Sequence, residues 1–262
     1  MHPILFHLGG HPIYTYGFFY GLSIFLGTVL GLRRFEREGH DGAFYLKSIL
    51  VAIIGAFFMG KLLHVVTNWP WYQVKWSRLW DLSTGHVFYG GYIGSILFPF
   101  FYSRWARQPF LPVLDVTATY MPLGLALHRT FACLMAGCCY GRPTDLPWGI
   151  VYPADALASQ AYGMVPVHPT QLYESTWALG MFAVLIFYRR HYRKVPGELI
   201  ALQIALYSLG RFFIEFFRGD ADRGSFVGLS TSQWISLILA ACVALAGIYL
   251  RRERKKAALG AA

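Results

Sequence analysis

The sequence predicts an all-α, polytopic integral membrane protein with seven transmembrane helices. Of its 262 residues, 56% are hydrophobic and only 14% are charged, whereas a soluble domain carries about 25% charged residues. Aromatic residues make up 18% of the chain, and a disordered chain has few aromatics and many charges. A soluble enzyme of ordinary composition and a disordered segment are therefore both excluded, and a membrane protein remains.

Seven apolar windows are long enough to cross a bilayer, which takes about 20 helical residues. Because lipid offers no hydrogen-bond partner to the backbone, runs this long and apolar are expected to be helices. The windows are Ile13–Leu32, Phe44–Val66, Val87–Tyr102, Leu111–Leu134, Leu172–Tyr188, Leu199–Phe217 and Trp234–Leu250. No repeat or hydrophilic linker separates them. We therefore expect residues 1–262 to form a single transmembrane domain, with residues 251–262 as a basic cytoplasmic tail.

Basic residues predict the orientation of the chain. One set of alternate loops, with the C-terminal tail, holds 15 Lys and Arg, and the opposite set holds five. Cytoplasmic loops carry the excess, so the N-terminus is expected outside and the C-terminus in the cytoplasm. This distribution accounts for the net charge of +10 without a nucleic-acid partner. The first window has no basic segment before it and no small-residue cleavage site, so we expect no removable signal peptide.

Ionisable side chains at membrane depth point to a binding site. A central Arg costs at least about 2.5–3.5 kcal/mol, so one that remains usually faces a partner, a cavity or a charged ligand. A helical spacing of four, four and three residues places one set of such side chains on a single helix face: Tyr207, Arg211, Glu215 and Arg218. Arg129 lies near the outward end of the fourth window, in the same membrane half. Two Arg forks suit a phosphate, so we expect a phospholipid headgroup site; a structural Arg211–Glu215 pair is the alternative.

The outward loop at residues 135–170 is long and rich in Gly and Pro, which is typical of functional loops. It leads into the segment His168-Pro-Thr-Gln-Leu-Tyr-Glu174, which crowds polar side chains onto the entry turn of the fifth predicted span. Such side chains can bind the helix backbone or a lipid headgroup, and Pro169 suits a first helical turn.

Taken together, these motifs resemble the prolipoprotein diacylglyceryl transferase family over most of the chain. The resemblance rests on the segment ending at Glu174, the Tyr207-to-Arg218 face, the pair Tyr16-Gly17, the glycines Gly90, Gly91 and Gly94, and the seven spans. Members move the diacylglyceryl group of phosphatidylglycerol to the lipobox cysteine thiol of a preprolipoprotein, which forms a thioether and releases glycerol phosphate. The resemblance implies a transferase of lipoprotein biosynthesis in the bacterial inner membrane, with its active site toward the periplasm. Its partners would be phosphatidylglycerol, the signal-peptide lipobox and membrane lipids, with no metal and no cofactor.

The resemblance also implies roles for individual residues. The phosphate would be held by Arg129 and Arg211, with Glu215 orienting Arg211. The catalytic residues would be Arg129, Arg211, Glu215, Tyr16, Tyr89 and His168. The substrate-binding residues would be Arg129, Arg211, Tyr207, Gln171, Glu174, Gly90, Gly91 and Cys138.

Two regions depart from the family pattern. Tyr89 stands where members have a histidine before the Gly-Gly pair, and a tyrosine with a pKa near 10 is a poor base. After Arg129 only glycines of the signature match, one residue is inserted, and the family's glutamate falls near Cys138. Three interpretations follow: a transferase whose base is His128, His168 or Glu174; a paralogue with another acceptor; or an inactive lipid-binding relative.

Three cysteines beside Arg129 also admit several interpretations. Cys133 could form a disulfide with Cys138 or Cys139, the three could bind a metal with His128, or Cys138 could be a nucleophilic thiolate. Cys242 is expected to be buried in the seventh span. The competing class of protein is a small channel or lipid transporter, for which the sequence lacks a matching pair of interrupted helices.

Overall fold

The structure, a computed structural model, describes residues 4–81, 85–219 and 225–259 and is mostly helical there. Five of the described helices are long and apolar enough to cross a membrane: Thr15–Arg37, Gly42–Thr67, Phe110–Ala136, Glu198–Phe217 and Thr231–Arg252. These coincide with five of the seven predicted windows. Helices α4 (Phe88–Trp105) and α8 (Thr170–His191) occupy the third and fifth windows, and their crossing of the membrane stays a prediction.

The chain divides into two compact units. Unit 1 holds residues 1–31 and 115–262, and unit 2 holds residues 32–114. Helix α1 (Thr15–Arg37) runs from the first unit into the second, and α5 (Phe110–Leu127) runs back. A single domain therefore stays a prediction, and each unit is described separately below.

Unit 2 is built on the close packing of α2 (Gly42–Thr67) against α4. Asp41 caps the start of α2, because its carboxylate accepts a hydrogen bond from Ala43 N at 2.9 Å. A Cβ at Gly94 would collide with the Gly55 carbonyl, and one at Gly90 would collide with the Met59 carbonyl. These glycines therefore let two helix backbones touch, as small residues do in membrane helix pairs. The short helices α3 (Trp69–Gln73) and η1 (Trp76–Trp80) follow α2.

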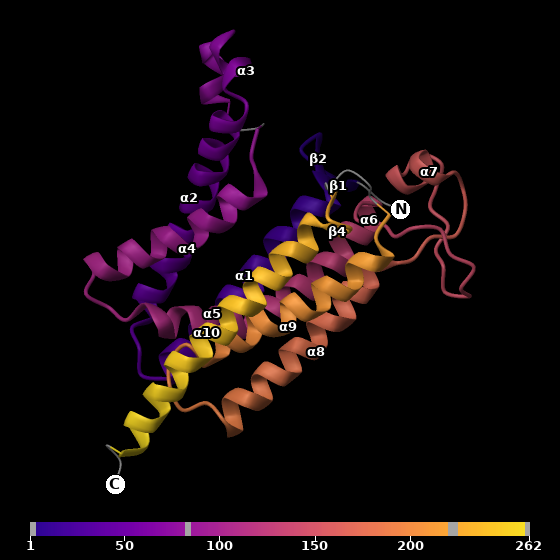
Figure 1. Cartoon of the computed structure of the whole chain (residues 1–262). Coiled ribbons are helices and arrows are strands. Elements are labelled where there is room, and N and C mark those ends of the chain that lie inside the picture. Colours follow the sequence, from indigo (N-terminus) through magenta and orange to yellow (C-terminus); the bar gives the residue numbers. More distant parts are fainter. Residues whose placement is uncertain (1–3, 82–84, 220–224, 260–262) are drawn as a thin grey trace. The chain divides into compact units, whose positions relative to one another are not determined.

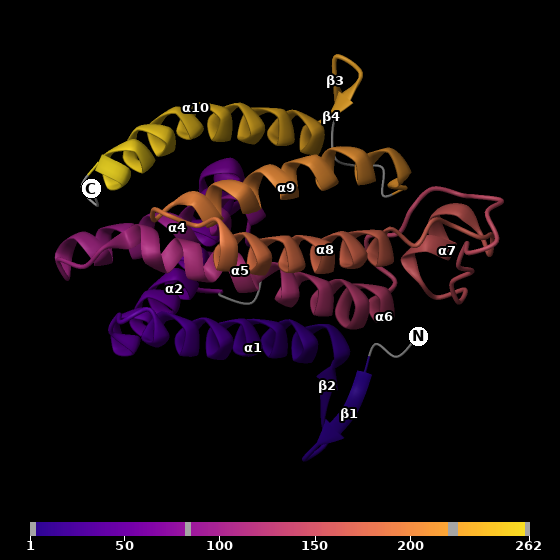
Figure 2. The ribbon, with the colours of Figure 1, turned by 90° about the horizontal axis from the view of Figure 1, so that it is seen from below.

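In unit 1, helices α8, α9 (Glu198–Ile214) and α10 (Thr231–Leu259) lie side by side, as Figures 1 and 2 show. Gly210 allows α8 and α9 to approach, since a Cβ there would meet the Trp177 indole ring. The helix α10 continues through the basic residues that follow Leu250. Cys242 on α10 is exposed, so the expectation that it is buried is wrong: in a bundle of apolar helices, an apolar side chain on the outer face contacts lipid instead of protein.

The helix containing Arg129 changes its winding. After α5 the chain forms a π-helical segment, η2 (His128–Cys133), and then the short helix α6 (Leu134–Ala136). A π turn closes with i to i+5 bonds and so holds one residue more than an α turn. Gly137, with φ of 66°, then ends the helix in the left-handed conformation.

The loop at residues 135–170 is tied to the neighbouring helix ends. It contains the short helix α7 (Leu157–Tyr162), which lies beyond the N-terminal end of α8 (Figure 2). Tyr152, Ala158 and Val167 form a small apolar core inside it, and burial raises the pKa of Tyr152 to about 12. Gly141 pairs with Arg218 in an isolated β-bridge, which holds the loop beside the end of α9.

The predicted helix face ending at Arg218 is only partly helical. The α-helix stops at Ile214, and a 3₁₀ turn, η3 (Glu215–Phe217), follows. Arg218 is extended, with φ of −71° and ψ of 143°. Tightening to a 3₁₀ turn is common at helix ends, where the last carbonyls lack intrahelical partners. Two short hairpins complete the described residues: β1 (Ile4–Leu8) with β2 (His11–Tyr14), and β3 (Ser225–Phe226) with β4 (Leu229–Ser230).

Candidate functional site

A carboxylate on α8 is shared by three arginines. Glu174 Oε1 lies 3.0 Å from Arg218 Nη1 and 3.3 Å from Arg211 Nη1, and Oε2 lies 2.5 Å from Arg129 Nε. The Arg129 contact is an ion pair without hydrogen-bond alignment at Nε. Glu174 is 7% exposed. We call Arg129, Arg211 and Arg218 the arginine cluster; three separate segments (η2, the last turn of α9 and the residue after η3) bring its members to Glu174.

A second carboxylate holds Arg211. Glu215 Oε2 lies 2.6 Å from Arg211 Nη2, and the same nitrogen donates a hydrogen bond to Ser232 Oγ at 3.1 Å. Tyr207, one turn before Arg211, lines a small cleft together with Arg211 and Glu174. Three guanidinium groups and two carboxylates thus leave a net positive charge in a largely buried place, which favours binding of an anion.

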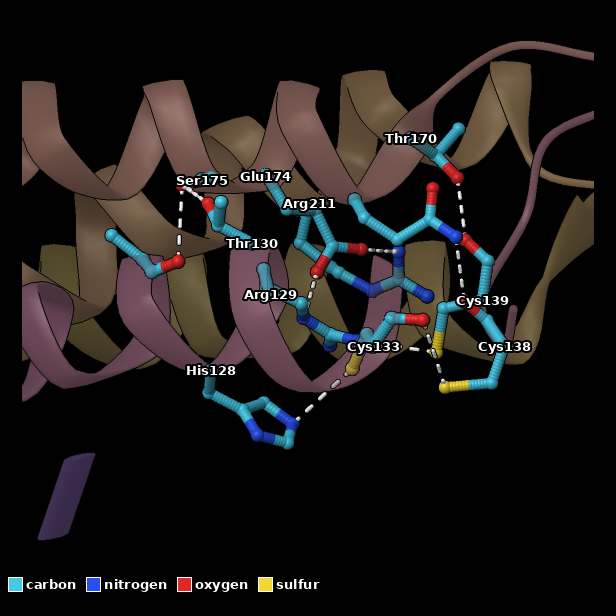
Figure 3. A network of polar contacts seen from close by, with 12 residues as sticks. His128, Arg129, Thr130, Cys133, Cys138, Cys139, Thr170, Glu174, Ser175 and Arg211 are labelled. Carbon is cyan, nitrogen blue, oxygen red and sulfur yellow. Dashed lines mark hydrogen bonds and ion pairs between the residues drawn. The ribbon is translucent and has the colours of Figure 1, made fainter. Parts of the chain in front are cut away.

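The sulfur atoms of Cys133, Cys138 and Cys139 lie near Arg129, on the side away from Glu174 (Figure 3). Arg129 Nη1 donates hydrogen bonds to Cys139 Sγ at 3.1 Å and Cys133 Sγ at 3.5 Å. Cys133 Sγ is 3.3 Å from His128 Nε2. The Cys138 thiol instead donates to the Cys133 carbonyl at 3.7 Å. All four cysteines of the chain are free thiols.

An apolar groove adjoins the charged site. Its volume is about 700 Å³, and Trp177 and Ile214 line both this groove and the small cleft at Glu174 and Arg211. The groove residues are almost all apolar: Leu146, Trp148, His168, Tyr173, Thr176, Trp177, Gly180, Met181, Val184, Leu206, Phe213, Ile214 and Phe217. An apolar groove beside a positive cluster matches the two halves of a phospholipid, the acyl chain and the phosphate.

His168 lies at the edge of this groove. Its Nδ1 is 3.1 Å from the Tyr173 hydroxyl, and its ring packs edge-on against Phe217 with centroids 5.1 Å apart. Burial and the nearby Arg142 charge lower the pKa of His168 below its ordinary value of 6.5. The ring is therefore neutral at neutral pH and can accept a proton.

Other predicted site residues fall into two groups. Tyr16 packs its ring against that of His128, with centroids 5.2 Å apart, and Gln171 Nε2 donates to the Cys138 carbonyl at 2.7 Å, so both lie near the arginine cluster. Gly90 and Gly91 belong to unit 2, where they pack against α2. The backbone of Tyr89 is in α4, and its side chain lies outside the described residues.

The sequence did not predict that Glu174 pairs with several arginines, or that Arg218 is one of them. Arg218 shares the four, four, three spacing with Arg211, so its contact with Glu174 had a signal in the sequence. Ser232, at the start of α10, had none, because only the packing of α10 against α9 brings it to Arg211.

Fold and site define a helical membrane protein with a buried arginine–carboxylate cluster beside an apolar groove. The family model for prolipoprotein diacylglyceryl transferases matches residues 3–249, and the chain belongs to this family. It is 36% identical over 245 residues to phosphatidylglycerol–prolipoprotein diacylglyceryl transferase 2 of Clostridium perfringens, covering 91% of each chain. It is 34% identical over 257 residues to the phosphatidylglycerol–prolipoprotein diacylglyceryl transferase of Clostridioides difficile, covering 97% of this chain and 98% of that one.

Proposed function

We propose that the chain transfers the diacylglyceryl group of phosphatidylglycerol to the lipobox cysteine thiol of a prolipoprotein. The names of its relatives give diacylglyceryl transfer between phosphatidylglycerol and a prolipoprotein, and the lipobox thiol as acceptor is part of the proposal. The observation that carries the proposal is the sharing of Glu174 by three arginines beside an apolar groove. Such a site suits a lipid whose phosphate must be held while its glyceryl carbon reacts.

The arginine cluster would stabilise the leaving group. In the transfer, a carbon–sulfur bond forms, the bond between the glyceryl carbon and the phosphate oxygen breaks, and glycerol phosphate leaves with the electron pair. Guanidinium groups aimed at the phosphate stabilise the charge that develops on this oxygen. Glu174 and Glu215 hold the guanidinium groups in position before the lipid binds, so little reorganisation is needed during the reaction.

His168 is the base that the geometry favours. The acceptor thiol must lose a proton, and both carboxylate oxygens of Glu174 are already engaged by three arginines. His128 Nε2 is engaged with Cys133. His168 borders the groove and has a pKa below 6.5, so its neutral form is present at neutral pH to receive the proton.

In the membrane, we propose seven spans with the N-terminus outside and the C-terminus in the cytoplasm. The excess of Lys and Arg in one set of loops supports this orientation, and α4 and α8 supply the two further helices. The arginine cluster then lies toward the outer side of the bacterial inner membrane. A secreted prolipoprotein could reach it there with its lipobox still in the membrane.

Two alternatives keep the lipid site but change its use. The departures at Tyr89 and Cys138 fit a paralogue that transfers the lipid group to another acceptor, or a relative that binds or transports lipid without reaction. All three readings predict phosphatidylglycerol binding. They differ in the fate of the diacylglyceryl group.

The test is a transfer assay with the purified full chain in vesicles. Phosphatidylglycerol labelled in its diacylglyceryl group and a lipobox peptide are the substrates, and Arg211→Ala is the control variant. The proposal predicts a peptide heavier by one diacylglyceryl group on its cysteine, together with free glycerol phosphate. Consumption of the lipid with an unmodified peptide would favour another acceptor. Bound lipid without turnover, or lipid movement between leaflets in the same vesicles, would favour the non-catalytic reading.

A further inference from the structure

The thiols of Cys133, Cys138 and Cys139 form a compact group beside Arg129. They do not take part in the ion pairs of Glu174 and Glu215. Their Sγ atoms all lie within 4.8 Å of one another. Cys133 is buried, and the other two are partly exposed. Three thiols this close can exchange protons and, on oxidation, form a disulfide after a small rotation of their side chains.

The backbone around the cysteine pair is clamped by α8. Gln171 Nε2 donates to the Cys138 carbonyl at 2.7 Å, and Thr170 Oγ1 donates to the Cys139 carbonyl at 2.6 Å. Cys139 has a φ of 62°, a left-handed conformation that is uncommon for a residue with a side chain. The two hydrogen bonds offset its cost and direct the Cys139 thiol toward Arg129 (Figure 3).

Arg129 supplies the positive charge next to these thiols. Its Nη1 atom lies 3.1 Å from Cys139 Sγ and 3.5 Å from Cys133 Sγ. A guanidinium nitrogen therefore lies within hydrogen-bond distance of two of the three sulfur atoms. The positive charge of Arg129 beside these sulfur atoms favours a thiolate there.

Among the three cysteines, Cys139 is the one whose thiolate form this environment favours. The neighbouring Cys133 and Cys138 thiols, and then the charges of Arg129 and Arg218, lower the pKa of Cys139 below its ordinary value. Hydrogen bonds involving Cys133 and Cys139 raise the pKa of Cys138. A partly exposed thiolate in a positive environment is the usual form of a reactive cysteine.

We propose that Cys139 and Cys133 are a redox-sensitive thiol pair that forms a disulfide beside Arg129. The oxidant is a low-molecular-weight disulfide. The Cys139 thiolate attacks one of its sulfur atoms, and one thiolate leaves. Cys133 then loses its proton to that thiolate and attacks the Cys139 sulfur, which expels the second thiolate. The protein is oxidised by two electrons, and the small disulfide is reduced to a thiol and a thiolate.

The disulfide would change the charge at Arg129. It removes the thiolate that accepts a hydrogen bond from Arg129 Nη1, so that this nitrogen needs another acceptor. The consequence for catalysis rests on the proposed function, in which Arg129 holds the lipid phosphate. The formation of the disulfide does not rest on it.

The first experiment uses the unmodified full chain. The protein is reduced, treated with glutathione disulfide at pH 7, alkylated and mapped by mass spectrometry. If the proposal is right, two thiols are lost, a disulfide joins Cys133 to Cys139, and Cys138 and Cys242 are alkylated. Four alkylated cysteines, a link through Cys138, or a bound metal ion that protects all three thiols would overturn it.

Single substitutions identify the attacking thiol. In Cys133→Ser the second step is blocked, so glutathione should stay attached to Cys139. In Cys139→Ser no attachment to Cys133 or Cys138 should occur at the same concentration, and Cys138→Ser should form the link as the unmodified chain does. Glutathione on Cys138 in the first variant would contradict the assignment.

Oxidation should also lower the transfer rate at least about tenfold, and dithiothreitol should restore it. If the disulfide forms in a chain that has no transfer activity, only the proposed function is refuted.

Discussion

Arg129 and Arg211 approach the same carboxylate from different helices: Arg129 Nε lies 2.5 Å from Glu174 Oε2, and Arg211 Nη1 lies 3.3 Å from Oε1. Two guanidinium groups that meet on one carboxylate can also meet on one phosphate, since both anions present oxygen atoms at similar spacing.

Replacing Glu174 with Gln should destabilise the protein and abolish transfer. The change leaves three guanidinium groups without their shared carboxylate, and removing one partner of a buried ion pair costs about 3–5 kcal/mol. Denaturant unfolding measures the loss. Glu38→Gln is the matched control, because its ion pair with Arg34 at 2.8 Å is partly exposed and worth about 0–1 kcal/mol. Equal stability of the two variants would contradict the central role of Glu174.

Glu215 should position Arg211 without acting as a base. In Glu215→Gln the 2.6 Å ion pair to Arg211 is lost, the guanidinium becomes mobile, and both KM for phosphatidylglycerol and kcat should worsen, together by about 100-fold. Glu215→Asp should restore part of the loss. A fall in kcat with an unchanged KM, recovered at higher pH, would instead identify Glu215 as the proton acceptor.

The acidic limb of the pH–rate profile should belong to His168. Its neutral form is the active one, and its pKa is lowered from 6.5, so kcat/KM should fall only as the pH drops through a value below 6.5. His168→Gln should lower kcat about 100-fold or more and remove this limb. A limb that lies above pH 6.5, or one that persists in the variant, would rule out His168 as the base.

Filling the apolar groove should weaken lipid binding. Gly180 lines the groove, and a Cβ there meets nothing within 4 Å, so Gly180→Leu should fold and raise KM for phosphatidylglycerol at least about tenfold, equivalent to about 1.4 kcal/mol. Gly247→Leu on α10 is the control, because a Cβ there also meets nothing within 4 Å and Gly247 does not line the groove. The same KM in both variants would show that the groove does not bind the lipid.

A buried aspartate near the opposite end of the helical stretch that carries Arg129 should affect stability alone. Asp115 is fully buried, and its carboxylate accepts hydrogen bonds from Gly197 N at 2.9 Å and Ile200 N at 3.0 Å. Asp115→Ala leaves these donors at the start of α9 unpaired and should cost about 3–5 kcal/mol, with kcat unchanged at low temperature. Asp145→Ala, in the exposed loop, should change stability by less than about 0.5 kcal/mol.

Hydropathy predicted the helices well because, in lipid, the backbone N–H and C=O groups of a segment must form their hydrogen bonds within that segment. The fourth window, Leu111–Leu134, lies inside the continuous helical stretch Phe110–Ala136. The spacing of Arg211 and Glu215 likewise predicted an ion pair that the structure contains. Such features depend on residues that are close in sequence.

Contacts between distant segments could not be derived in this way. Glu174 was expected to bind substrate, but its pairing with Arg129 and Arg218 depends on how η2, α8 and η3 meet. The π turn at His128–Cys133 could not be derived either, because the hydropathy of a segment does not distinguish a π turn from an α turn. The choice of Cys139 over Cys138 as the partner of Arg129 depends on the left-handed backbone of Cys139.

The most direct test of the central claim is growth of a bacterium depleted of its own diacylglyceryl transferase. We expect the unmodified chain to restore growth and to attach diacylglyceryl to a reporter lipoprotein, seen by mass spectrometry. Arg211→Ala, expressed in the membrane at the same level, should restore neither. Failure of the unmodified chain to modify the lipoprotein, although it is folded and inserted, would contradict the account.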